Sequence, residues 1–357
     1  MSAEAIVEAR RQVEICNACR YCEGYCSVFP AITRRRSFSD ADMVQLANLC
    51  HNCRGCYYAC QYTEPHEFKL NIPKAFAELR QQTWQEHAVP QPLARVFHRS
   101  GVAIAFAAIV GFALLIWAVQ SLGSAGGEGF YAVLSHNAMV LVFAPAFVLP
   151  LIAIALSVRS YWRRIGGGSF TKEHVLAAFC SASRMRDLAG GHGEGCNFED
   201  DDRFSSERRW NHQLVMYGFL LCFAATSVAT IMHYVFDMPA PYAFLSLPKL
   251  LGVIGGLALC IGTVGLAALK VSADRDQGDA RVWGGEMAFI LLLFCVSLSG
   301  LALYALGSSS WLSALLVIHL GTVLAFFLLM PYSKMVHGFF RLAALIADAK
   351  DKASTNA

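Results

Sequence analysis

Charged residues are scarce in this sequence. Asp, Glu, Lys and Arg make up 15% of the 357 residues, whereas a soluble domain usually has about 25%. Hydrophobic residues reach 56%, and the mean hydropathy is +0.44. The shortage is uneven, because residues 1–100 are polar and charged while most of the rest consists of long apolar runs. This distribution predicts a soluble head on a polytopic membrane body.

Features of several other protein classes are also missing. The net charge of +3 is too small to indicate nucleic-acid binding, and no nucleic-acid motif is present. The first residues, MSAEAIVEARRQVEIC, contain no apolar core of a secretory signal, so we expect the head to stay in the cytoplasm. No HExxH, Ser/His/Asp set or paired carboxylate site appears. GGHGEGC does not fit GxGxxG, so no flavin or nicotinamide site is expected on this chain.

Six apolar runs are long enough to cross a bilayer, which takes about 20 residues per helix. The loops that we assign to the cytoplasm, above all residues 159–211, carry most of the Lys and Arg, whereas Lys249 is the only cation of the opposite loops. We therefore predict that the chain lies in the cell inner membrane and, by the positive-inside rule, that both termini face the cytoplasm. The predicted spans lie near residues 101–122, 138–158, 213–236, 249–270, 286–307 and 311–332.

Eight cysteines of the head form two runs with the same spacing, CNACRYCEGYC and CHNCRGCYYAC. Cx2Cx2Cx3C is the spacing with which bacterial ferredoxins bind cubane clusters, and the fourth cysteine of each run ligates the other cluster. The sequence therefore predicts two [4Fe–4S] clusters. The first has the ligands Cys16, Cys19, Cys22 and Cys60, and the second has Cys50, Cys53, Cys56 and Cys26.

Zinc and disulfides are the alternatives for these thiols. Structural zinc prefers paired cysteines around one tetrahedral ion, and a disulfide framework conflicts with the cytoplasmic placement. Between the two runs, Ser39 is a candidate N-cap for a stretch with apolar residues at helical spacing. This stretch favours a helical ferredoxin-like head over a β-rich one.

Four histidines lie on two helices, within the third and sixth predicted spans or just beyond their ends. His212 and His233 lie near opposite ends of the third span, while His319 lies inside the sixth and His337 near its cytoplasmic end. The two helices are expected to run antiparallel. Along the helix axis, His212 and His233 would lie roughly 31 Å apart, and His319 and His337 roughly 27 Å apart. We therefore predict b-type haem ligation by His212 with His337 on the inner side and by His233 with His319 on the outer side. His136 is a reserve ligand for the outer site, and the alternative is that histidines at helix ends are interfacial residues.

Two stretches resemble haem-bearing helices of a known family. HLGTVLAFFLLMPYSKMVHGFF, residues 319–340, resembles the haem helix of the nitrate reductase gamma subunit and of its heterodisulfide-reductase relatives. RRWNHQLVMYGFLLCFAATSVATIMHY, residues 208–234, is similar to the partner helix. In the gamma subunit the second ligand of the partner helix stands where this chain has Cys222.

Taken together, the order of parts resembles the tricarballylate/citrate utilization protein B family over nearly the whole length. The shared parts are the double-cubane head, the six spans and a long loop of the form GCN…RR…H, here Gly195–Cys196–Asn197 through Arg208–Arg209 to His212. The resemblance implies a protein that accepts electrons from an FAD-bearing cytoplasmic flavoprotein dehydrogenase acting on a tricarballylate-type substrate. It also implies quinone in the membrane lipid as the acceptor.

These observations give one prediction for the whole chain. The expected fold is all-α, with a helical double-[4Fe–4S] ferredoxin-like head on a six-helix transmembrane haem b bundle. The expected cofactors are two clusters and one or two haems b. The competing hypotheses are a heterodisulfide-reductase-like subunit that moves electrons from quinol to a thiol partner, and a membrane redox sensor. The predicted divisions are a head at 1–98, a membrane domain at 99–345 that includes the loop 159–211, and a polar tail at 346–357.

Overall fold

The structure, a computed structural model, describes residues 2–122, 131, 134–189, 196–197 and 204–355. Its regular elements are helices, apart from a short antiparallel pair of β1 (Cys196–Asn197) with β2 (Phe204–Ser205). Gly195 of the predicted loop motif lies outside the described residues, as do positions 123–130 and 132–133 of the predicted outer loop. The all-α prediction is confirmed.

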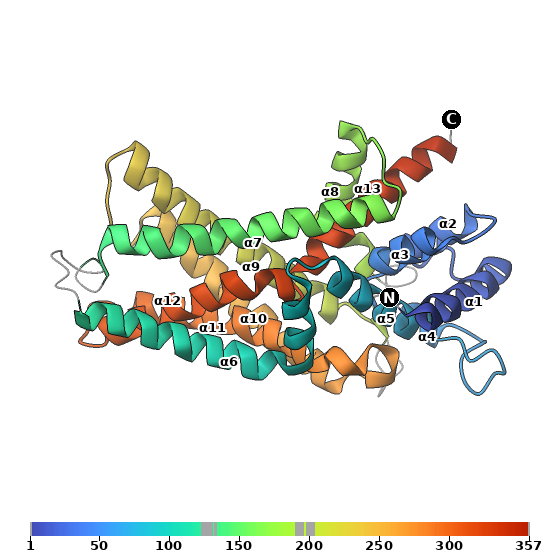
Figure 1. Cartoon of the computed structure of the whole chain (residues 1–357), viewed down its shortest axis with the longest axis horizontal. Helices are drawn as coiled ribbons and strands as arrows, with labels where there is room; N and C mark the ends of the chain where they lie inside the picture. The colour runs from blue at the N-terminus through green and yellow to red at the C-terminus, as the bar shows by residue number, and fades with distance from the viewer. Residues whose placement is uncertain (1, 123–130, 132–133, 190–195, 198–203, 356–357) are drawn as a thin grey trace.

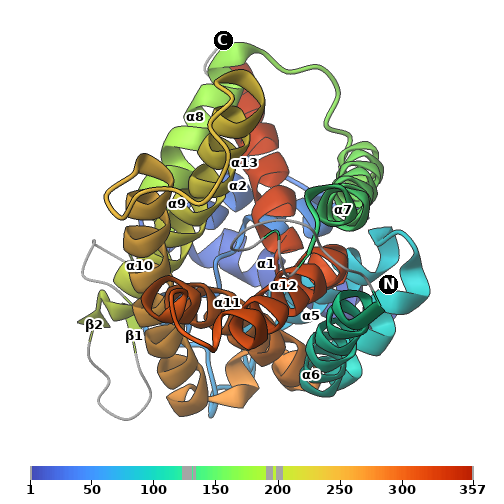
Figure 2. The same ribbon diagram turned by 90° about the vertical axis from the view of Figure 1, so that its left-hand side faces the viewer.

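Within the described part of the chain, six helices are long and apolar enough to cross a membrane. Their most apolar segments have mean hydropathies between 2.0 and 2.7, so they make this chain a membrane protein. Figure 1 shows them side by side along the long axis, and Figure 2 views the bundle from the end away from the head. They are α6 (Gln91–Leu122), α7 (His136–Arg164), α9 (Glu207–Val235), α10 (Leu247–Ser272), α11 (Trp283–Leu306) and α12 (Leu312–Leu329).

Two of these helices extend well beyond the predicted spans. Helix α6 begins at Gln91 and is interrupted at Ser100, where φ is −132° and ψ is 31°. Helix α7 continues to Arg164 and contains Pro145 and Pro150. The backbone hydrogen bonds of a helix can continue past the edge of the hydrocarbon core, so hydropathy marks the bilayer crossing rather than the helix ends.

Glycines allow α9 and α10 to approach closely. A Cβ added at Gly218 of α9 would lie 2.7 Å from the backbone N of Leu259 and 2.8 Å from the carbonyl O of Gly255. A Cβ at Gly255 of α10 would in turn lie 2.8 Å from the carbonyl O of Gly218. Small residues at such crossings let two backbones come into van der Waals contact within a membrane. This contact sets where His212, on the same helix as Gly218, stands in the bundle.

Gly218→Val is therefore expected to destabilise the bundle by roughly 1–3 kcal/mol, because the added side chain must push backbone atoms apart. The measurement is the thermal unfolding midpoint of the purified protein in detergent. Gly111→Val is the matched control, since a Cβ at Gly111 of α6 meets nothing within 4 Å. Equal midpoints for the two variants would show that the close crossing does not stabilise the fold.

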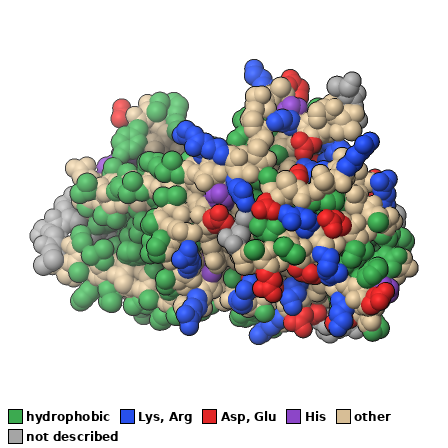
Figure 3. All heavy atoms as spheres, turned by 45° about the vertical axis from the view of Figure 1, so that its right-hand side comes forward, with side chains coloured by type: hydrophobic (Ala, Val, Ile, Leu, Met, Phe, Trp, Pro, Cys, Tyr) green, Lys and Arg blue, Asp and Glu red, His purple; other side chains and the backbone are tan. Residues whose placement is uncertain are grey.

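The head consists of short helices that pack around a common apolar core. Ser39 caps the third of them as predicted, and forms a capping box with Asp42. Met43, Leu46 and Phe76 are fully buried in this core. Figure 3 shows that Lys, Arg, Asp and Glu side chains gather over the head, whereas hydrophobic side chains cover the membrane part. The head helices are α1 (Ala3–Cys19), α2 (Val28–Thr33), α3 (Asp40–Leu49), α4 (Gly55–Tyr58) and α5 (Ile72–His87).

The C-terminal helix α13 (Val336–Thr355) joins the two parts of the molecule. It follows α12 after a 3-10 turn at Met330–Tyr332, and Figure 1 shows it running from the bundle towards the head. Ala344 and Leu345 belong to the core of the head. The helix thus passes through the predicted boundary at residue 345, and residues 346–355 of the predicted tail are helical. Its apolar stripe, rather than its polar composition, decides this placement.

The loop after α7 contains an amphipathic helix and a short turn. Helix α8 (Lys172–Arg184) is followed by the 3-10 turn η2 (Arg186–Leu188). Ala178 of α8 is buried in the same core as Ala344 of α13, while Leu176 and Phe179 are exposed. One face of α8 therefore packs on α13 and brings the turn at Asp187 beneath the head.

Candidate functional site

The first set of thiols surrounds an open cavity. Cys16 and Cys19 lie in the last turn of α1, and the left-handed Arg20 (φ 57°) turns the chain so that Cys22 follows closely. Cys60 comes from the segment after α4. The cavity measures about 210 Å³ and is lined by these four thiols together with Tyr21 and Tyr62.

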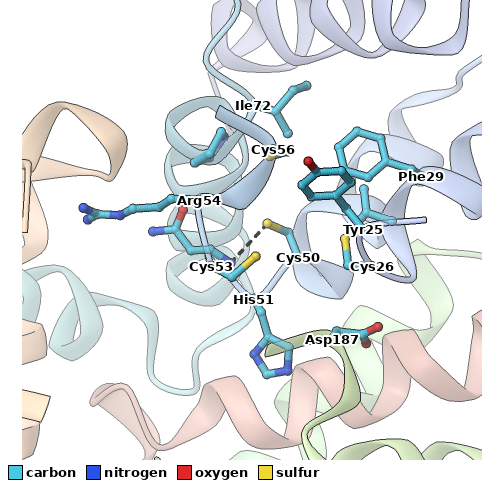
Figure 4. Close-up of a pocket in the computed structure, with 13 residues that line it drawn as sticks. Tyr25, Cys26, Phe29, Cys50, His51, Cys53, Arg54, Cys56, Ile72 and Asp187 are labelled. Carbon is cyan, nitrogen blue, oxygen red and sulfur yellow. Dashed lines mark hydrogen bonds between the residues drawn. The ribbon is translucent and has the colours of Figure 1, made fainter. Parts of the chain in front are cut away.

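The second set of thiols surrounds a narrower, more enclosed cavity of about 20 Å³ (Figure 4). Cys50 is the C-cap of α3. The left-handed residues Asn52 (φ 55°) and Arg54 (φ 69°) then turn the chain on either side of Cys53 before α4 begins. This cavity is lined by Cys26, Cys50, Cys53 and Cys56. The structure thus places Cys60 with the first triplet and Cys26 with the second, the arrangement in which each run supplies one thiol to the other set.

The surroundings of the thiols disfavour the charged thiolate form. Burial, together with the neighbouring thiols of the same set, raises the pKa of Cys16 and of Cys22 to about 12. In the second set, burial raises the pKa of Cys26 and of Cys56 well above the ordinary value. Because iron binds the thiolate form, each set needs a cationic centre to compensate four converging thiolates. The donor set and its enclosure fit an iron–sulfur cluster in each cavity.

Backbone N–H groups also point at the sulfurs. The N–H of Asn52 donates to Sγ of Cys50, and that of Tyr62 donates to Sγ of Cys60, both at 3.3 Å. Such hydrogen bonds stabilise charge on a cluster and help to set its reduction potential. Cys22 contributes to the raised pKa of Cys56, so the two sets are also near neighbours.

The inner histidines face each other across two helices. His212 of α9 and His337 of α13 have ring centroids 5.8 Å apart and ring planes at 75°. Nδ1 of His337 bonds to the carbonyl O of Lys334. Since a carbonyl only accepts, Nδ1 carries the proton and Nε2 keeps the lone pair that a metal requires. A backbone carbonyl that accepts from Nδ1–H is a usual support of a metal-binding imidazole, so this pair of side chains could hold a haem iron.

The outer histidines are arranged differently from the predicted pair. His233 stacks on His136, with centroids 4.5 Å apart and planes at 24°. His319 of α12 instead lies 3.0 Å from Ser299, measured from Nδ1 to Oγ, and a Cβ at Gly300 would lie 3.1 Å from its ring. The structure therefore gives His233 the reserve ligand His136 as its neighbour. Helical rise fixes the depth of each histidine but not which helix stands opposite.

His319 nevertheless has the tautomer that a metal ligand needs. The hydroxyl of Ser299 lies 2.6 Å from the carbonyl O of Cys295, to which it donates. Its oxygen is left to accept from Nδ1–H of His319, so Nε2 of His319 holds the lone pair. Both His319 and His337 thus present Nε2 in the same chemical state.

The sequence analysis did not identify three residues at the head–membrane junction, which are His51, Asp187 and Arg341. His51 follows Cys50 and lines the second cavity with Asp187. Burial lowers the pKa of His51 well below its usual value, and the charges of Arg341, His212 and His337 lower it further. The ring therefore lies near both the second thiol set and the inner histidine pair. In the sequence, only the position of His51 next to Cys50 could have indicated its place near the site. No sequence pattern indicated Arg341 or Asp187.

Comparison with known proteins gives consistent matches. The family model "Citrate utilization protein B Fer4-like domain" matches residues 9–99, and "Citrate utilization protein B" matches residues 88–357. The chain is 42% identical over 356 residues to citrate utilization protein B of *Escherichia coli*, covering 98% of this chain and 93% of that protein. The chain belongs to the citrate utilization protein B family. No solved structure matches it.

Membership of the citrate utilization protein B family supports a general function for the thiol-lined site. The Fer4-like match contains all eight clustered thiols, and the second match contains the six apolar helices. Together they indicate an iron–sulfur electron-transfer role in the use of citrate or tricarballylate. The resemblance predicted from the sequence is confirmed.

Proposed function

We propose that this chain passes electrons from a reduced FAD-bearing dehydrogenase to membrane quinone, through two [4Fe–4S] clusters and haem b. The observation that carries the proposal is the series of neighbouring sites: the open first set, the enclosed second set, His51, and the inner pair of His212 with His337. When bound, the clusters and haem supply one-electron chemistry. The residues of the chain hold these centres in order from the exposed end of the head towards the bilayer.

The direction of flow and the donor belong to the proposal as well. The dehydrogenase would act on tricarballylate or a related tricarboxylate, and it would dock at the cytoplasmic side, where the first cavity opens. Its reduced flavin releases two electrons and two protons for each quinone that becomes quinol. Because the chain contributes no flavin motif, the dehydrogenase must be a separate protein. The head and both termini are proposed to face the cytoplasm.

The test uses anaerobically purified full-length protein in detergent. Photoreduced free FAD should reduce a b-type haem absorption band, and a water-soluble quinone analogue should then reoxidise it. A protein with intact clusters but no haem band would support the sensor hypothesis instead. Reduction of the clusters by quinol, followed by oxidation through a disulfide acceptor, would support the heterodisulfide-reductase-like alternative.

A further inference from the structure

We propose that Arg341 is a positioning residue that holds the second thiol set against the inner histidine pair. The inference rests on the proposed function, because it concerns the step between the head and the membrane. Arg341 lies on α13 four residues after His337, so the two side chains share a face of the helix. Arg341 is 8% exposed and lies at the boundary between the head and the bundle.

One arm of Arg341 holds the segment of Cys50. Its Nη1 donates to the carbonyl O of Leu49, which is the last residue of α3 and immediately precedes Cys50. The last carbonyls of a helix have no partner within the helix. Arg341 therefore satisfies a free helix end and fixes the start of the loop that carries Cys50 and Cys53.

The other arm reaches the segment of Cys26 through one carboxylate. Nη2 of Arg341 lies 2.9 Å from Oδ2 of Asp187, which is 5% exposed. Oδ1 of Asp187 accepts from the N–H of Ser27 at 3.0 Å and from its hydroxyl at 2.6 Å. Ser27 directly follows Cys26. A single buried ion pair thus joins the helix of His337 to both chain segments that enclose the second cavity.

His51 lies within the same assembly. Figure 4 shows its imidazole pointing away from the thiols, while Asp187 stands at the same side of the cavity. The charge of Arg341 acts on both His51 and Cys50. A displacement of Arg341 would therefore move or expose the groups that separate the second thiol set from the histidine pair, and electron transfer falls steeply as such a gap widens.

The experiment compares Arg341→Gln, Arg341→Lys and Asp187→Asn with Arg34→Gln in the purified full-length protein. Arg34, at the end of α2, forms a partly buried ion pair with Asp348, two turns further along α13 than Arg341. Its ion-pair partner is not next to a clustered cysteine. It is therefore a matched control for the loss of a head–α13 ion pair. The readouts are haem and iron content, the rate of haem reduction by photoreduced FAD, the reduction potential of the clusters, and hydrogen exchange of residues 24–33 and 46–56.

Arg341→Gln should slow haem reduction by about 10-fold or more at unchanged haem and iron content, because the second thiol set and the histidine pair are no longer held at a fixed separation. Arg341→Lys keeps the positive charge but not the two-armed geometry. It should keep a cluster potential near that of the wild type while transfer stays slow. Asp187→Asn, which keeps an oxygen for Ser27, should give an intermediate rate, and Arg34→Gln should transfer at nearly the wild-type rate.

Two results would overturn the inference. Wild-type transfer rates in both Arg341 variants would show that the guanidinium does not position the centres. Equal slowing by Arg34→Gln would show a general loosening of the head. Hydrogen exchange distinguishes failure of the Arg341 inference from failure of the proposed function. If the wild type lacked haem, faster exchange at residues 24–33 and 46–56 in Arg341→Gln would still establish the contact, and unchanged exchange would refute it.

Discussion

Cys56→Ala is expected to cut the iron content of anaerobically purified protein from about eight to about four atoms per chain, because one of two cubanes loses a ligand. Cys56 lines the second cavity, whereas the four thiols of the first cavity stay in place. Haem reduction through the head should fall by at least about 100-fold, since the interrupted site lies between the first set and the inner histidines. Iron and acid-labile sulfide assays measure the first effect and stopped-flow absorption the second.

Matched variants sharpen this prediction. Cys22→Ala should remove the other cluster and leave the same amount of iron as Cys56→Ala. Cys180→Ala is the control, because Cys180 lies exposed on α8, away from both cavities. Loss of all iron in either single variant would mean that the eight thiols do not form two independent sites. One zinc per set in place of iron would end the electron-transfer proposal.

His337→Ala is expected to remove the inner haem almost completely, because the imidazole across from His212 is lost and no carbonyl-supported Nε2 remains there. The reduced-minus-oxidised absorption spectrum and a pyridine haemochrome assay measure haem per chain. His212→Ala should give the same loss. His174→Ala is the control, since His174 lies in the first turn of the surface helix α8.

The same assay examines the outer histidines. If a second haem uses His319, His319→Ala should lower the haem content by about one per chain and leave the inner spectrum unchanged. Comparison of His233→Ala with His136→Ala then shows which of these stacked residues takes part. Haem content that stays at the wild-type level in both His337→Ala and His212→Ala would refute the inner assignment.

Local patterns made much of this molecule predictable from sequence. Apolar runs mark the six long helices, and Ser39 marks the start of α3, because both signals depend on neighbouring residues. The Cx2Cx2Cx3C runs likewise indicated which thiols would share a cavity, since the exchange of the fourth cysteine follows from the spacing. The facing of His212 and His337 could be proposed because both lie at one end of antiparallel helices.

Contacts between distant segments could not be predicted in this way. Asp187 meets Ser27 across 160 positions and Arg341 across 154, and neither contact leaves a periodic trace. The stacking of His233 on His136 depends on the rotation and order of the helices, which helical rise does not determine. The last residues look like a polar tail because composition does not show that Ile346 packs against the core of the head and that Ala347 is buried.

The role of α13 in the head has a consequence for biogenesis. The ribosome releases the segments of both thiol sets long before it makes α13. At about 5–20 residues per second, the roughly 250 residues from the end of α5 to the start of α13 take on the order of 12–50 s to synthesise. During that interval the second cavity lacks Arg341, and the core of the head lacks Ala344 and Leu345. Until α13 is made, the second thiol set is therefore less enclosed than in the finished protein.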